Sequence, residues 1–150
     1  IAVATVMVAG LAFAPTATSA PLDTGSKTTS KYNVVKRVID GDTVLLANGA
    51  RVRLIGYDTP ERGQPLYGAA KRSLDQMIGG RVKLVNPTSV QNKDGYGRLL
   101  RYVRTSGRDT GKVQVRKGLA HARYDSRDGY DWHPMQKAYR RLDARTADRW

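Results

Sequence analysis

The stretch "YNVVKRVIDGDTVLLANGARVRLIGY", residues 32 to 57, places two tight-turn signals between three runs rich in β-branched residues. Asp40-Gly41 separates the first two runs, and Asn48-Gly49 separates the last two. Such pairs mark β-hairpins because glycine accepts the positive φ that a two-residue turn requires. The sequence therefore predicts a meander of three antiparallel strands, over residues 32–39, 42–48 and 51–57.

The chain beyond the meander alternates between helical and strand patterns. Residues 66–78 repeat apolar side chains at helical spacing, and Gly79-Gly80 ends that pattern. The apolar face of this helix is expected to hold Leu66, Ala70, Leu74, Met77 and Ile78. Two further strands are expected over residues 81–85 and 98–104, and a short helix over residues 111–118. A final helix is expected over residues 134–150, with Pro134 at its first position and Met135, Ala138, Leu142 and the stem of Arg145 on one face.

The order of these elements predicts the fold class. Five short strands, a helix after the third and more helix at the end are typical of an α+β protein built on a five-stranded Greek-key OB-fold barrel, with about three helices. OB folds often bind nucleic acid, although a fold alone does not establish a function.

The N-terminal residues differ in composition from the rest of the 150-residue chain. Residues 1–19 carry no charge and begin with an apolar run that is too short to span a bilayer, which takes about 20 residues. The run and the small residues after it predict a secretory signal peptide without its start, so we expect a secreted or cell-envelope-associated protein with no stable membrane insertion after cleavage. An uncleaved anchor or a buried strand is the alternative. Residues 20–31 are expected to form a flexible linker, and residues 32–150 one domain.

Charge and cysteine content narrow the function classes. The formal net charge is +13, and every charged residue lies after residue 20. Such a charge predicts a polyanionic partner, above all DNA or RNA, with anionic wall polymers or plain solubility as alternatives. The absence of cysteine excludes thiolate metal sites, thiol nucleophiles and disulfides. His121 and His133 do not have ligand spacing and are interpreted as surface or packing residues.

Three acidic residues lie at expected strand ends. Asp42 begins the second strand, and Asp58 and Glu61 follow the third. Neighbouring strands lie about 4.8 Å apart, so Asp42 and Asp58 can converge on one point and offer oxygen ligands of the kind that Ca²⁺ prefers. Pro60 stops the strand and holds Glu61 near Asp58 but directed elsewhere, where its carboxylate can accept a proton from water. The structural alternatives are that Asp42 is a turn residue, that Asp58 is a strand-end cap and that Glu61 is a surface charge.

Two arginines and two tyrosines are candidates for contacts with a nucleic acid. Arg53 alternates with Val52 and Leu54 and is expected to face outward, while Arg98 opens the last strand; paired guanidinium groups can hold a phosphate. Tyr96, between two glycines, and Tyr124 can each stack on a base. Solvated arginines and half-buried tyrosines are the alternatives.

The order of the motifs "VIDGDTV", "RVRLIGYDTPE", "DGYGRLLRYV" and "VRKGLAHARY" resembles the staphylococcal nuclease (thermonuclease) family, from about Val34 to Trp150. The resemblance implies a Ca²⁺-dependent nuclease that cleaves DNA and RNA without base-specific readout, leaves 3′-phosphate ends and acts as a monomer. By position it implies that the metal ligands are Asp42, Asp58 and the Thr59 carbonyl. It implies that the catalytic residues are Arg53, Glu61 and Arg98. It also implies that Tyr96 and Tyr124 bind the substrate.

The chain departs from the family pattern at four places. Residues 62–68 form a shorter loop, Gly95 replaces a lysine, Ser126 replaces a tyrosine and Thr110-Gly111 stands where an asparagine is usual. None of these changes touches the expected metal ligands, the base or the arginines. A basic OB-fold module that binds nucleic acid or wall polymers without cutting them is the alternative function. All five acid and arginine positions are filled, which favours the enzyme.

Overall fold

The computed structural model describes residues 32–147. The expected signal peptide, linker and extreme C-terminus lie outside the described residues. The elements, in chain order, are β1 (Asn33–Val38), β2 (Thr43–Leu46), β3 (Arg51–Leu54), β4 (Tyr57–Asp58), α1 (Tyr67–Ile78), β5 (Arg81–Val85), β6 (Leu99–Thr105), β7 (Arg108–Asp109), α2 (Thr110–Arg116), β8 (His121–Ala122), the 3-10 helix η1 (Ser126–Asp128) and α3 (Gln136–Asp143).

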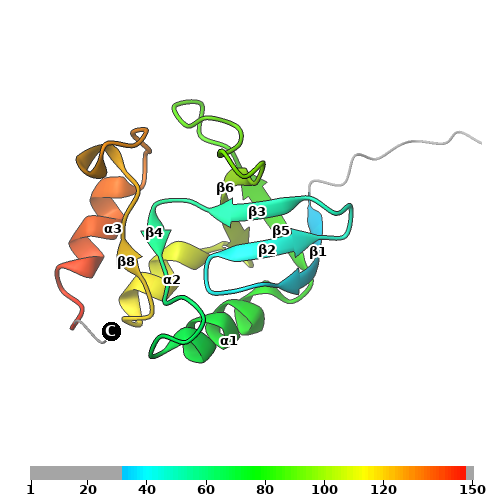
Figure 1. The fold of residues 1–150 in the computed structure, drawn as a ribbon, viewed down its shortest axis with the longest axis horizontal. Helices are drawn as coiled ribbons and strands as arrows, with labels where there is room; N and C mark the ends of the chain where they lie inside the picture. Colours follow the sequence, from blue (N-terminus) through cyan, green and yellow to red (C-terminus); the bar gives the residue numbers. More distant parts are fainter. Residues whose placement is uncertain (1–31, 148–150) are drawn as a thin grey trace, which may run out of the picture.

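Five of the strands close into a barrel. The antiparallel meander β1–β2–β3 is confirmed, β5 pairs with β1, and β6 pairs with β5. A parallel pairing of β3 with β6, in which Val52 lies opposite Leu99, closes the sheet on itself. This strand order is that of a five-stranded OB-type barrel, and the three helices lie around it (Figure 1). The predicted fold class is therefore confirmed.

Alternation along the strands fills the barrel interior. Val44 of β2, Val52 and Leu54 of β3, and Val82 of β5 are almost completely buried. Helix α1 presents the predicted apolar face to this core through the buried residues Ala70, Leu74 and Ile78. Its predicted first member, Leu66, instead precedes the helix in a left-handed conformation with φ of 64°.

The third predicted strand is interrupted, and this interruption shapes the site. β3 ends at Leu54, Gly56 adopts a φ of 85°, and the chain resumes as β4, which pairs with β8 outside the barrel. A Cβ on Gly56 would lie 2.5 Å from the ring of His133, so only glycine fits at this bend. Residues on both sides of the bend therefore reach the same end of the barrel.

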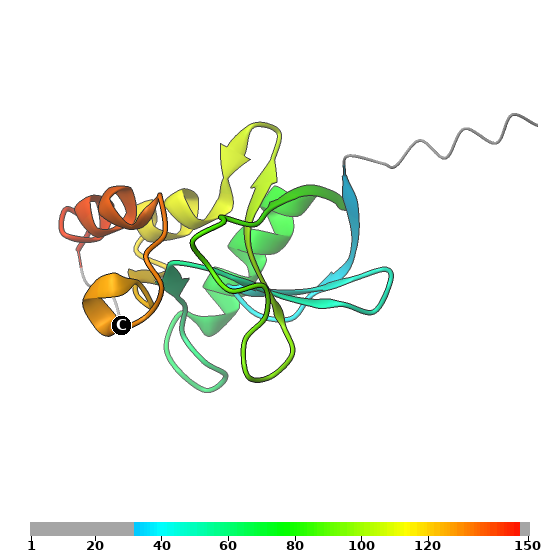
Figure 2. The ribbon, with the colours of Figure 1, turned by 90° about the horizontal axis from the view of Figure 1, so that it is seen from above.

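The C-terminal helices pack beside the barrel and against each other (Figure 2). The short helix predicted over residues 111–118 is confirmed as α2, with Gly118 just beyond it in a left-handed conformation. The predicted start of the last helix is wrong, because Met135 caps α3 and Pro134 stands before the cap. On the predicted face, Met135 and Leu142 are partly buried and pack against the core, but the inclusion of Arg145 is wrong. Arg145 is exposed beyond the helix, and the fully buried residue is Tyr139, whose ring packs edge-on against Tyr57 at 6.2 Å.

Candidate active site

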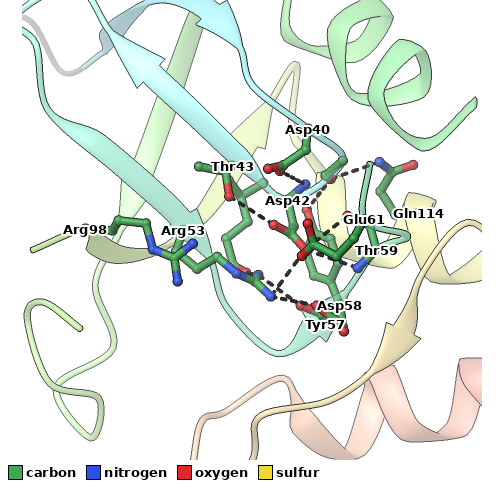
Figure 3. Close-up of polar contacts among 12 residues, drawn as sticks. Asp40, Asp42, Thr43, Arg53, Tyr57, Asp58, Thr59, Glu61, Arg98 and Gln114 are labelled. Atoms are coloured by element: carbon green, nitrogen blue, oxygen red, sulfur yellow. Dashed lines mark hydrogen bonds and ion pairs between the residues drawn. The ribbon is translucent and has the colours of Figure 1, made fainter. Parts of the chain in front are cut away.

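The two predicted acidic ligands converge at one end of the barrel. The Asp42 carbonyl accepts a hydrogen bond from the Leu54 amide at 2.8 Å, which sets the start of β2 beside the end of β3. Nη2 of Arg53 lies 3.2 Å from Oδ2 of Asp42 and 3.1 Å from Oδ1 of Asp58 (Figure 3). The two carboxylates therefore share one cationic group, as their predicted convergence requires.

Asp42 is held rigidly by hydroxyl and amide donors. Its Oδ2 accepts bonds from the Thr59 amide at 3.1 Å and the Thr59 hydroxyl at 3.0 Å, and its Oδ1 accepts one from the Thr43 hydroxyl at 3.0 Å. The Asp42 residue is 5% exposed. These contacts fix the carboxylate before any ligand arrives, and they tie the "DTPE" turn that contains Thr59 to the start of β2.

Arg53 does not face outward, so that prediction is wrong. The residue is 9% exposed, because the carboxylates and the bend after β3 cover the outer side of its strand. Its Nη1 donates to the carbonyl oxygens of Leu54 and Tyr57. Burial alone would lower the pKa of Arg53, but the charges of Asp42 and Asp58 outweigh that effect and raise it. Arg53 is therefore an always-charged group fixed by four oxygen acceptors.

Burial also raises the pKa of two acidic residues in the site. Burial raises the pKa of Asp58, and the charge of Arg53 opposes this rise while those of Asp42 and Glu61 add to it. The pKa of Asp40 rises to about 6, mainly through burial and then through the charge of Asp42. Such crowding of carboxylates makes a nearby cation favourable, because a positive charge offsets their mutual repulsion.

The remaining predicted residues line one cleft around this cluster. The cleft has a volume of about 870 Å³, and Asp42, Arg53, Asp58, Glu61, Arg98, Tyr96 and Tyr124 all border it. Glu61 is exposed there, with its amide donating to the Gln64 side chain at 2.6 Å. The amide of Gln64 donates back to the Glu61 carbonyl at 2.9 Å. The short loop therefore folds into a compact turn that fixes the backbone of Glu61.

Arg98 and the two tyrosines border the same cleft as the acids. Arg98 is anchored by Asp94, whose Oδ2 accepts a bond from Nε at 2.7 Å, and its guanidinium lies 5.3 Å from the ring centre of Tyr96. Tyr96 is 86% exposed, so it is no packing residue. Tyr124 is 38% exposed, and the guanidinium of Arg53 lies 5.3 Å from its ring centre. Both rings are accessible for stacking.

Sequence reasoning missed several residues of the site. The Asp40-Gly41 pair predicts a positive φ at Gly41, but the φ of Gly41 lies outside the left-handed range. A Cβ there would lie 2.8 Å from side-chain atoms of Ala70 and Thr59, so the glycine permits close packing of the loop. Nε2 of Gln114, on α2, donates to the Gly41 carbonyl at 3.1 Å and to the Ala70 carbonyl at 2.9 Å. No local pattern could have indicated this contact across 73 residues.

Two departures from the family pattern have local counterparts in the structure. Ser126 lies in η1 and exchanges hydrogen bonds with Gln136 of α3. Another aromatic residue, Tyr130, borders the cleft and packs edge-on against Tyr124 at 5.2 Å. Gly111 packs so closely that a Cβ would lie 2.6 Å from the Tyr139 hydroxyl, and Gln114 of the same helix bonds to the Gly41 carbonyl.

The histidines are packing residues, as interpreted. His133 is 1% exposed and shares a 2.6 Å hydrogen bond with the Tyr102 hydroxyl through Nδ1. His121 Nδ1 lies 3.1 Å from Asp143 Oδ1, which ties β8 to α3.

Comparison with known proteins agrees with this arrangement. Thermonuclease of Staphylococcus intermedius is 38% identical over 101 residues, which cover 61% of this chain and 59% of that protein. Endonuclease YncB of Bacillus subtilis (strain 168) is 36% identical over 98 residues, covering 59% of this chain and 46% of that protein. Staphylococcal-like nuclease CAN1 of Arabidopsis thaliana is 34% identical over 85 residues, covering 55% of this chain and 25% of that protein.

The chain thus spans about half the length, or less, of these curated relatives. The family described as "Staphylococcal nuclease homologue" matches residues 51–146, which include the end of the barrel, the cleft loops and the C-terminal helices. With its closed OB-type barrel and its paired carboxylates around a buried arginine, the chain belongs to the staphylococcal nuclease homologue family.

Proposed function

We propose that the protein is a Ca²⁺-dependent nuclease that hydrolyses DNA and RNA phosphodiesters and leaves 3′-phosphate ends. The observation that carries the proposal is the convergence of Asp42 and Asp58 on Arg53, inside a cleft that Glu61 and Arg98 also border. The names thermonuclease and endonuclease among its relatives support the same chemistry. Recognition rests on backbone charge and stacking, so no base-specific readout is expected.

The donor chemistry of the site fits Ca²⁺. Within residues 32–147, no three His, Asp or Glu side chains gather closely enough to form a metal site by themselves. Two carboxylates, Asp42 and Asp58, already surround a positive charge, and hard oxygen ligands of this kind suit Ca²⁺. Together with the Thr59 carbonyl they would hold the ion, and water and substrate oxygens would complete its 6–8 ligands. Bound there, Ca²⁺ supplies positive charge that polarises the phosphate.

Each of the cleft side chains has a separate role in the hydrolysis. Glu61 accepts a proton from water as the water oxygen bonds to phosphorus, and the bond from phosphorus to the 5′-oxygen breaks as that oxygen takes up a proton from solvent water. The products are a 3′-phosphate and a free 5′-hydroxyl. Arg53 and Arg98 donate to the phosphate oxygens, where negative charge grows during attack. Arg53 is already fixed by its acceptors, so its charge needs no reorganisation. Tyr96 and Tyr124 stack on the flanking bases.

Chelation tests the metal. Single-stranded DNA incubated with the protein and Ca²⁺ should be degraded, excess EDTA should abolish degradation, and added Ca²⁺ should restore it. Full activity in excess EDTA would contradict the metal role. Retention of labelled DNA without cleavage under either condition would favour the non-catalytic binding module.

Substitution of Glu61 tests the base. Glu61 is the only glutamate in the sequence, and Glu61→Gln should lower kcat by about 10²–10⁴-fold with little change in affinity for single-stranded DNA. Asp75→Asn, on the exposed side of α1, makes the same change of charge outside the cleft and should leave kcat unchanged. Unchanged turnover in Glu61→Gln would remove Glu61 from the mechanism.

We also propose secretion and action as a monomer. Secretion is supported by the uncharged, apolar start of the sequence and is tested by following the protein into the culture medium. Among residues 32–147, no helix has the length and apolar character needed to cross a membrane. Action as a monomer is supported by the cleft, whose proposed acid, base, arginine and tyrosine residues all come from one chain.

A further inference from the structure

A second hollow lies on the C-terminal side of the molecule, between the loop around η1 and helix α3. Its volume is about 540 Å³, and its lining includes Arg127, Trp132, Pro134, Lys137, Arg140 and Arg141. We call it the α3 groove. The proposed nuclease chemistry uses none of these six residues.

The charge of the α3 groove is entirely positive. Four of its lining residues are cations, and no acid lines it. Arg140 is neutralised by Asp125 and Asp128, at 2.7 and 2.6 Å. Within residues 32–147, the exposed cations Arg127, Lys137 and Arg141 have no side-chain ion pair. The groove therefore offers three uncompensated cations, which suit a polyanion.

An exposed aromatic ring accompanies these cations. Trp132 is 54% exposed, although tryptophan is usually highly buried in a folded domain. With Pro134 it gives the groove an apolar wall between cationic groups. An aromatic platform flanked by cations is the arrangement on which single-stranded nucleic acids bind, with bases on the ring and phosphates on the charges.

The groove and the cleft lie on the two sides of one chain segment. Successive residues of one short segment face the two hollows: Tyr130, Asp131 and His133 border the cleft, and Trp132 and Pro134 border the groove. A strand bound in the cleft therefore needs to pass only this segment to reach the groove. The segment runs beside α3, as Figures 1 and 2 show.

We infer that the α3 groove is a second subsite for single-stranded nucleic acid, occupied by the part of the strand that extends past Tyr124 and Tyr130. Trp132 stacks on a base, and Arg127, Lys137 and Arg141 contact phosphates. The route of the strand rests on the proposed function, but binding in the groove requires no hydrolysis. Short strands that fill only the cleft do not reach the groove.

Fluorescence of Trp132 tests this directly. The sequence contains two tryptophans, so a Trp150→Phe background leaves Trp132 as the sole reporter. In EDTA, which prevents cleavage, thymidine oligonucleotides of about 4 and about 16 nucleotides bracket the usual footprint of an OB fold. The longer one should quench Trp132 emission at saturation, and the shorter one should not. Saturable binding of the longer strand, followed by anisotropy, without any quenching would overturn the proposal.

Substitutions separate the contributions of stacking and charge. Trp132→Ala should weaken binding of the longer strand about five- to tenfold and leave that of the shorter one unchanged, whereas Trp132→Phe should retain most of the affinity. Lys137→Gln with Arg141→Gln should reduce the slope of log affinity against log salt by about 1.4, or 0.7 per lost phosphate contact. Equal effects of Trp132→Ala on both lengths would contradict the subsite.

A matched charge control completes the test. Arg81→Gln with Lys83→Gln removes the same two charges from exposed positions on β5 that border neither hollow. This pair should change the salt slope much less than the groove pair does. Equal slopes in the two pairs would show that only overall charge matters and would overturn the subsite. Because the readouts are binding and fluorescence, they remain valid even if the protein proves unable to cleave nucleic acid.

Discussion

Arg53 is a cation buried between two carboxylates, and the geometry of the site depends on this single residue. Its guanidinium bonds to carbonyl oxygens of Leu54 and Tyr57 and to the carboxylate of Asp58, while also pairing with Asp42. A lysine cannot replace it, because a single ammonium lacks the planar fork of donors that reaches several acceptors at once.

Position 41 requires glycine because of close packing and not because of its turn geometry. Gly41→Ala should lower the free energy of unfolding by about 1–3 kcal/mol, because the new Cβ would lie 2.8 Å from atoms of Ala70 and Thr59. Urea unfolding monitored by circular dichroism measures this loss.

Gly95→Ala is the matched control for Gly41→Ala. A Cβ at Gly95 would meet no atom within 4 Å, and its φ is also outside the left-handed range. Its stability should therefore stay within about 0.5 kcal/mol of the parent. Equal losses in the two variants would show that the close approach at Gly41 carries no energetic weight.

At the scale of elements, α2 links the barrel to the loop between β1 and β2, which holds Gly41 and Asp42 and is called the acidic loop here. It is only seven residues long, and Asp109 caps it by accepting from the Lys112 amide at 2.9 Å. Two of its buried side chains contact different parts of the molecule. Thr110 donates to the Val103 carbonyl in β6, whereas Gln114 reaches the carbonyl of Gly41 beside Asp42.

Gln114→Leu should therefore impair catalysis as well as stability. Loss of two buried hydrogen bonds should lower the free energy of unfolding by about 1–3 kcal/mol, and release of the Gly41 loop should reduce kcat at temperatures where the variant is fully folded. Thr110→Val, equally buried on the same helix, should lower stability but leave kcat unchanged. A parental kcat in folded Gln114→Leu would contradict the positioning role of α2.

Helix α3 is tied to the cleft wall by charge. Asp125, whose side chain is fully buried, accepts from Nε of Arg140 at 2.7 Å and from its Nη2 at 2.9 Å. These bonds hold η1 and the segment with Tyr130 and Trp132 against the helix. The same pair therefore supports both the cleft and the α3 groove.

At the scale of the whole molecule, acid should weaken this support. The hydrogen bonds from Arg140 lower the pKa of Asp125, so the stability that they contribute is present above about pH 4 and is lost as the pH falls through the lower folded-state pKa. Asp125→Asn should be less stable than the parent by about 1.5–3 kcal/mol near neutral pH, and the difference should shrink toward about pH 3.

Urea unfolding across this pH range measures the convergence of the two proteins. Arg140→Gln, which removes the partner instead of the acid, should converge with the parent in the same way. A stability difference that is the same at neutral and acidic pH would show that the ion pair does not govern the acid response.

Closure of the barrel brings distant residues together over the whole molecule. The parallel pairing of β3 with β6 sets Arg53 opposite Leu100, two residues after Arg98. Both arginines therefore border the same cleft, although 45 positions separate them in the sequence. The chain also carries a formal net charge of +13, which favours a polyanionic partner.

The sequence by itself determined the meander, the helix after it and the positions of Asp42, Asp58 and Glu61, because these depend on local turn chemistry, apolar periodicity and a motif contained within a few residues. Only the tertiary structure decided that Arg53 is buried, that Gly41 is a packing glycine and that Gln114 reaches the acidic loop. It also decided that Tyr139 of α3 is fully buried, whereas Arg145 lies exposed beyond the helix. These features depend on contacts between segments far apart in the chain, and local propensity and spacing carry no record of such contacts.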